Sequence, residues 1–237
     1  MMSRPSWMMM KIRAAGKCIL AGLLLAGTGA VLQGQRADFN SWFELNLEKQ
    51  LGKRVDLAAE IEQRFNQNST RYDRSLLTVT ADYRIMDFLS VAGGGRVLMA
   101  ADNEMNISPR YRFHADLRGR YRVDNLNLSL RSRMQYGFEE FAYFGVVRDN
   151  RLINRNRLKG SYHIFGTRIG LFASAESWGL FHSENGHFFK RMRYTAGLIY
   201  AAGVRSELGL RYILEDEFNQ VDPMRSHILV LSYSHEL

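Results

Sequence analysis

Residues 126–131 read Leu126-Asn127-Leu128-Ser129-Leu130-Arg131, and residues 207–214 read Glu207-Leu208-Gly209-Leu210-Arg211-Tyr212-Ile213-Leu214. In both stretches every second residue is apolar, and most of the residues between them are polar. A β-strand turns successive side chains to opposite faces, so each stretch has one apolar and one polar face. Similar segments recur from Phe39 to Leu237, which predicts an all-β chain.

The alternating segments are separated by connections that are short and long in turn. The segments fall at 39–50, 55–65, 75–84, 88–98, 109–118, 126–136, 152–163, 168–177, 190–200, 206–215 and 226–237. Tight turns at one end and longer loops at the other are typical of an antiparallel up-and-down transmembrane β-barrel. Because single-chain bacterial barrels normally have an even number of strands, we expect about twelve strands, with ten as the alternative.

The N-terminal segment has the composition of a secretory signal peptide. Four basic residues, Arg4, Lys11, Arg13 and Lys17, precede an apolar run over 18–32 that has small residues at 27–30. We therefore divide the chain into a signal peptide, 1–34, and a barrel domain, 35–237. We expect the protein to be exported and then inserted into the outer membrane of a Gram-negative cell. The expected partners are therefore outer-membrane lipid and the barrel-assembly machinery.

The positive charge of the chain is nearly all arginine. The sequence has 26 arginines and 6 lysines, and its formal net charge is +8. Four basic and no acidic residues precede residue 35, which leaves a mild +4 for the rest of the chain. Nucleic-acid binding needs a clustered basic patch, so we expect no nucleic-acid partner.

Arginines recur in R-x-R patterns, such as Arg131/Arg133, Arg155/Arg157 and Arg191/Arg193. A spacing of two places both guanidinium groups on one face of a strand, and that face must be the lumen, because arginine at the lipid midplane costs roughly 2–4 kcal/mol. The predicted lumen lining is Glu44, Glu60, Glu62, Asp82, Arg112, Asp116, Arg131, Arg133, Arg155, Arg157, Glu176, Arg191, Arg193 and Arg211. Two interpretations stay open: a structural ion-pair network, and the lining of a narrow pore.

The sequence predicts no catalytic residues, no cofactor and no metal site. It contains neither G-x-S-x-G nor H-E-x-x-H. One alternative is a barrel hydrolase at the outer rim, where His182 and His187 share a predicted loop. Another is a secreted, lipocalin-like soluble barrel that binds a small apolar ligand, with the two faces reversed.

The order of several short motifs along the chain resembles a family of uncharacterised outer-membrane barrels common in Bacteroidota. The motifs are Ser41-Trp42-Phe43-Glu44, Glu62-Gln63-Arg64-Phe65, Leu130-Arg131-Ser132-Arg133-Met134-Gln135-Tyr136, Asn154-Arg155-Asn156-Arg157-Leu158, Ser174-Ala175-Glu176 and Leu231-Ser232-Tyr233-Ser234. The resemblance implies a non-enzymatic outer-membrane barrel and leaves the oligomeric state open. The sequence departs from the usual pattern at Leu237, where such barrels end in an aromatic residue.

Overall fold

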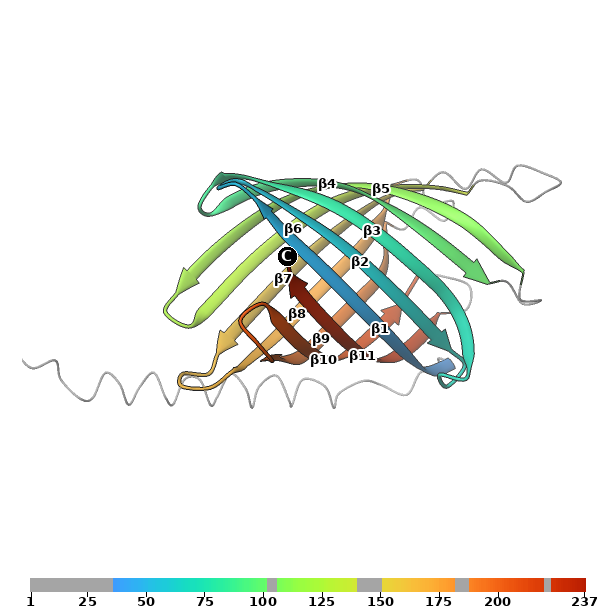
Figure 1. Cartoon of the computed structure of the whole chain (residues 1–237). Coiled ribbons are helices and arrows are strands. Elements are labelled where there is room, and N and C mark those ends of the chain that lie inside the picture. Colours follow the sequence, from blue (N-terminus) through green and yellow to red (C-terminus); the bar gives the residue numbers. More distant parts are fainter. Residues whose placement is uncertain (1–35, 102–105, 140–150, 182–187, 220–222) are drawn as a thin grey trace, which may run out of the picture. The chain divides into compact units, whose positions relative to one another are not determined.

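The computed structural model describes residues 36–101, 106–139, 151–181, 188–219 and 223–237, which form eleven strands (Figure 1). The strands are β1 (Arg36–Leu51), β2 (Val55–Asn66), β3 (Arg71–Met86), β4 (Leu89–Ala101), β5 (Ile107–Val123), β6 (Leu126–Glu139), β7 (Arg151–His163), β8 (Ile169–Leu180), β9 (Phe189–Ala201), β10 (Ser206–Glu217) and β11 (Met224–Glu236). The expected signal peptide, residues 1–34, lies outside the described residues. Within the described ranges, no helix is long and apolar enough to cross a membrane.

The alternation of the sequence sets the two faces of each strand. On β10, Leu208 and Tyr212 are 48% and 44% exposed, whereas Ile213 and Glu215 are 3% and 7% exposed. The same phase repeats around the sheet, with large apolar side chains outside and most charged side chains inside. The surface is therefore apolar where a soluble protein would be polar.

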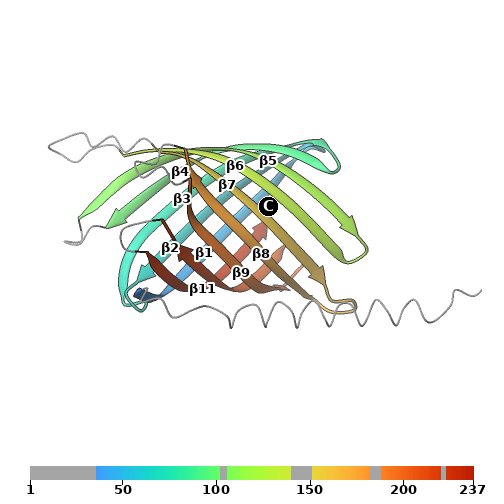
Figure 2. The ribbon, with the colours of Figure 1, turned by 180° about the vertical axis from the view of Figure 1, so that it is seen from behind.

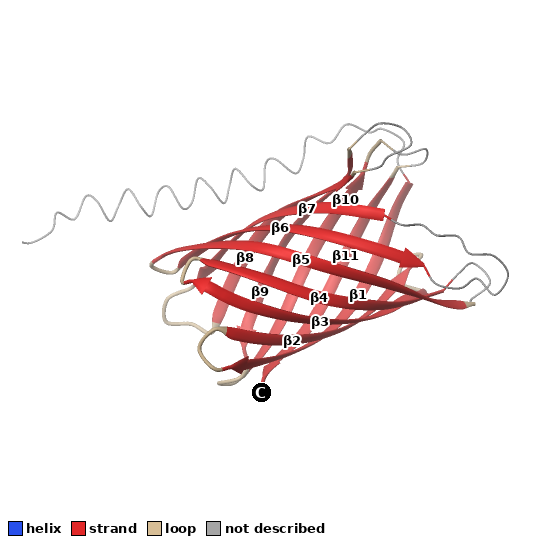
Figure 3. Ribbon diagram, turned by 90° about the horizontal axis from the view of Figure 1, so that it is seen from above, coloured by secondary structure: helices blue, strands red, loops and turns tan. Residues whose placement is uncertain are grey.

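The sheet closes into a barrel in which neighbours in sequence are neighbours in space. Consecutive strands pair antiparallel, and Figure 3 shows them tilted around the barrel. The ring closes between β1 and β11, which pair parallel from Arg36 opposite Met224 to Glu48 opposite Glu236. Figures 1 and 2 show these two strands side by side.

The structure confirms the predicted all-β up-and-down barrel, with eleven strands where about twelve were expected and with one parallel pair at the closure. The described residues form eleven strands, which is the number of alternating segments in the sequence. In a ring of up-and-down strands, an odd number makes the first and last strands run in the same direction. The parallel ladder between β1 and β11 pairs the backbone groups of both edges, so the barrel has no open edge.

The connections lie at two different ends of the barrel. The short turns, 52–54, 87–88, 124–125, 164–168 and 202–205, form what we call the short-turn end. Gly52 and Gly166 lie in these turns with φ of 73° and 74°, a region that favours glycine. The strand ends beside the intervals 67–70, 102–106, 140–150, 181–188 and 218–223 lie at the opposite end, the long-loop end. The predicted asymmetry of the loops is therefore present.

Part of the interior is apolar, which the alternating pattern did not predict. Trp42 on β1, Ile213 on β10, and Ile228 and Val230 on β11 form a buried cluster. Cross-strand register brings them together, since Trp42 lies opposite Val230 and Ile213 lies opposite Ile228. The inner face of the barrel thus combines an apolar cluster on β1, β10 and β11 with charged residues on the same and other strands.

Candidate functional site

The barrel encloses a cavity of about 2110 Å³ to which all eleven strands contribute lining residues. Along β1 the lining runs from Asp38, close to the long-loop end, to Gln50, beside the first short turn. The cavity therefore follows nearly the whole length of this strand. We call it the lumen.

Basic residues outnumber acidic ones in the lumen. Within the described ranges, seventeen basic and twelve acidic residues line it. Thirteen of the fourteen residues predicted to line the lumen are part of the lining: Glu44, Glu60, Glu62, Asp82, Arg112, Arg131, Arg133, Arg155, Arg157, Glu176, Arg191, Arg193 and Arg211. The fourteenth, Asp116, is not part of the lining, and its fully buried side chain pairs with Arg133 at 2.6 Å and with Arg118 at 2.7 Å.

One side of the lumen carries what we call the carboxylate wall, formed by Glu44 on β1 with Glu60 and Glu62 on β2. Glu44 and Glu62 lie directly opposite each other across the strand pair, which by itself is unfavourable. Each carboxylate has an arginine partner: Glu44 pairs with Arg211, Glu60 with Arg96 at 2.9 Å, and Glu62 with Arg64. Two of these partners come from strands that are not adjacent, so their side chains reach over the strand between.

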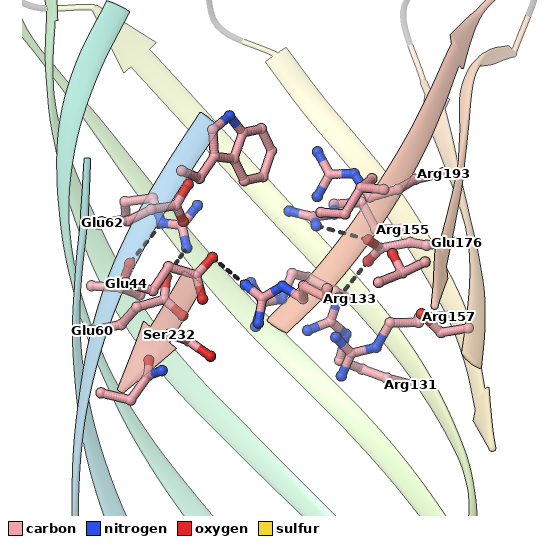
Figure 4. A pocket seen from close by; sticks show the side chains of 18 of the residues that line it. Glu44, Glu60, Glu62, Arg131, Arg133, Arg155, Arg157, Glu176, Arg193 and Ser232 are labelled. Carbon is pink, nitrogen blue, oxygen red and sulfur yellow. Dashed lines mark hydrogen bonds and ion pairs between the residues drawn. The ribbon is translucent and has the colours of Figure 1, made fainter. Parts of the chain in front are cut away.

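A second group, which we call the arginine block, consists of Arg131 and Arg133 on β6 with Arg155 and Arg157 on β7. The register places Arg131 opposite Arg157 and Arg133 opposite Arg155. Figure 4 shows the arginine block across the lumen from the carboxylate wall. The lumen therefore has walls of opposite character.

Two carboxylates hold the arginine block together. Glu176 on β8 accepts a hydrogen bond from Arg131 and another from Arg155 at 3.1 Å. Asp116 accepts two from Arg133, at 2.6 and 2.8 Å. Glu176 is 4% exposed and Asp116 is also 4% exposed, so water does little to screen these pairs. Removing either carboxylate would leave buried positive charges without a counterion.

Two tryptophans connect the arginines of different strands by stacking. The Arg64 guanidinium lies 3.7 Å from the centre of the Trp42 ring. The Arg193 guanidinium lies 5.2 Å from the Trp42 ring and 4.6 Å from the ring of Trp178, which Arg155 also approaches at 4.5 Å. These cation–π contacts extend from β2 through β1, β9 and β8 to β7. They link side chains of five strands inside the barrel.

Several lumen residues were not among the predicted ones, namely Arg64, Arg96, Arg118, Trp42 and Trp178. A spacing signal was available for two of them, because Arg64 follows Glu62 and Arg118 follows Asp116 at the interval that places both on one face. Each pair forms an ion pair in the structure. The inward tryptophans carried no such signal, since aromatic residues also occupy the outer face.

The hydrolase alternative rests on two histidines of one predicted loop. His182 and His187, which the hydrolase alternative used, lie outside the described residues. On the outer face, the His235 ring lies 3.0 Å from the Ser206 hydroxyl and stacks on Tyr233. No group of three or more metal-ligating side chains is present in the described part of the chain.

Comparisons with known proteins give a fold and a family. A solved structure titled "NanC porin structure in rhombohedral crystal form" is similar, with 14% identity, a TM-score of 0.53, and coverage of 84% of this chain and 99% of that chain. A second, titled "Unveiling the Mechanism Behind the in-meso Crystallization of Membrane Proteins", has 10% identity, a TM-score of 0.38, and coverage of 76% and 84%. The comparison with curated proteins found no match.

The first of these similarities shows that the chain has the fold of a porin barrel. The family comparison matches residues 39–223, which is most of the barrel and most of the chain. The chain therefore belongs to the family described as "Protein of unknown function (DUF2490)".

Proposed function

We propose that the protein is an integral outer-membrane β-barrel without enzymatic activity, and that its lumen is a narrow, water-filled pore that favours anions. The observation that carries the proposal is the charged lumen that runs along β1 inside a closed barrel with an apolar surface. A channel needs an inner surface that water can wet and an outer surface that lipid can cover.

The outer surface supports the membrane location. Leu130, Leu158 and Phe113 point outward and are 59%, 58% and 57% exposed. In water these side chains would form a large exposed apolar patch, whereas in a membrane they would contact the apolar lipid tails. A lipocalin-like soluble barrel needs apolar residues inside and charged residues outside, which is the reverse of this arrangement.

The balance of charge in the lumen supports anion preference. The seventeen basic and twelve acidic lining residues give an excess of positive charge within the described ranges. Charged rings set the selectivity of a pore by attracting ions of opposite sign. A purely structural ion-pair network would need no such excess, because each arginine could then be matched by one carboxylate.

The membrane location is tested by fractionation and by gel migration of unboiled samples. We expect the protein in the outer-membrane fraction, with a migration that changes on boiling because a closed barrel resists the detergent. Recovery in the soluble fraction with unchanged migration would contradict the proposal.

The pore is tested by inserting purified protein into planar lipid bilayers. Discrete current steps are expected, and the Ser174→Arg variant, which adds a bulky cation to the lumen, is expected to reduce the step size. Insertion without current would show that the lumen is plugged and that the barrel has a structural role.

A further inference from the structure

The arginine block contains more positive charge than its carboxylates balance. Within the described ranges, the carboxylates that pair with the block are Glu176 and Asp116, and Asp116 is also shared with Arg118 of β5. Two like charges directly opposite each other on neighbouring strands destabilise a sheet, and the block contains two such pairs. A surplus of about two positive charges therefore remains in one place.

Arg157 is the residue of the block that makes no direct ion pair among the described residues, although Glu176 lies on the neighbouring strand. Among the described residues, no hydrogen bond or ion pair involves Arg157, and its Nε atom is buried without a partner. It lies directly opposite Glu176, whose two oxygens accept hydrogen bonds from Arg131 and Arg155. The nitrogen Nε is also unpartnered in Arg131 and Arg155. The carboxylates therefore leave donors of the block unused.

The block is accessible from the lumen. Arg131, Arg133, Arg155 and Arg157 all line the cavity. Figure 4 shows Arg157 beside Arg131 on the wall away from Glu44 and Glu60. The residues of the block are therefore within reach of an anion in the lumen.

We propose that the arginine block binds the phosphate group of small solutes in the lumen, with Arg157 as its main uncompensated donor. The inference rests on the proposed water-filled lumen and names the solute class that it recognises. A phosphate group carries roughly −1.5 to −2 charges near neutral pH and three acceptor oxygens, which matches the surplus of the block. The planar guanidinium donates two parallel hydrogen bonds to such a group. A carboxylate carries a single charge and matches only half of the surplus.

The test is calorimetric titration of the full barrel in detergent with three probes at constant ionic strength: inorganic phosphate, glycerol phosphate and acetate. We expect phosphate to bind at least about tenfold more tightly than acetate. Phosphate carries more negative charge than acetate and accepts more charge-assisted hydrogen bonds. Comparable affinity for glycerol phosphate would assign the site to phosphate monoesters as well as to free phosphate, and binding of inorganic phosphate alone would restrict it to the free ion. Equal affinities for phosphate and acetate would overturn the proposal.

The variant Arg157→Gln is compared with Arg120→Gln, which also removes one positive charge from the lumen lining but lies toward the short-turn end. We expect R157Q to weaken phosphate binding roughly ten- to a hundredfold and R120Q to weaken it less than about threefold. Equal losses in both variants would show general attraction by the lumen instead of a site.

Two further readouts keep the result interpretable. Heat-dependent gel migration shows that each variant is folded, and Arg157→Lys, which keeps the charge but not the paired donors, is expected to lose an intermediate share of the affinity. Full affinity in R157K would contradict recognition by the guanidinium fork. Binding is measured without current, so the two proposals can fail separately. Phosphate binding by a barrel that conducts no ions would contradict the proposed pore and support the phosphate site. Ion current without phosphate binding would support the pore and contradict the phosphate site.

Discussion

Replacing Glu176 with glutamine removes the carboxylate that pairs with both Arg131 and Arg155 while keeping the shape of the side chain. The three side chains are 5%, 10% and 12% exposed, so the two arginines would remain nearly buried without a counterion. Breaking a buried ion pair by removing one partner costs roughly 3–5 kcal/mol. Because the pair borders the lumen, which the proposed pore fills with water, we expect the lower end, about 3 kcal/mol of unfolding free energy.

The assay is unfolding in urea, followed by the loss of the folded band on an unboiled gel. Glu207→Gln is the matched control, because Glu207 also lines the lumen but is exposed. We expect the control to change the free energy of unfolding by less than about 0.5 kcal/mol. Equal changes in the two variants would refute the argument that the buried pairing of Glu176 stabilises the arginine block.

Three further predictions address the faces, the packing and the width of the barrel. Leu158→Arg places a charge on the outer face and is expected to destabilise the barrel in lipid by roughly 2–4 kcal/mol, whereas the lumen-facing Ser174→Arg should fold normally; equal unfolding midpoints would contradict the assignment of faces. Gly94→Ala is expected to lower the urea midpoint, because an added Cβ would lie 2.4 Å from the Val79 carbonyl oxygen and 2.7 Å from the His114 ring, while Gly119→Ala meets nothing within 4 Å and should have little effect. Trp178→Ala removes the ring between Arg155 and Arg193 and is expected to increase the single-channel current. The control is Tyr162→Ala, which changes an outward-facing side chain. An unchanged current in the Trp178 variant would show that the Trp178 ring does not narrow the lumen.

The strands and their faces could be predicted from the sequence because a strand has a period of two residues. In the run from Leu126 to Arg131, the charged side chain is assigned to the lumen, so the alternate leucines are assigned to the outer face. The eleven alternating segments correspond to the eleven strands, but the even strand number usual for bacterial barrels pointed to twelve or ten. How the ring closes depends on pairing between β1 and β11, which local alternation does not specify.

The lumen lining could be predicted as a set but not as a network. Spacing shows that Arg131 and Arg133 share a face, yet the partner of Arg131 is Glu176, which is 45 residues away and two strands over. Such contacts depend on register and on the reach of long side chains across an intervening strand. The inward position of Trp42 and Trp178 could not be predicted for a different reason. Aromatic residues occur on both faces of a membrane barrel, so residue type does not indicate the face.

The most direct test of an anion-favouring lumen is the reversal potential of the wild-type protein in a planar bilayer with a potassium chloride gradient. We predict a reversal potential displaced from zero toward the equilibrium potential of chloride, because the lumen carries more basic than acidic residues. A reversal potential displaced toward the equilibrium potential of potassium would contradict the account, as would well-inserted protein that carries no current.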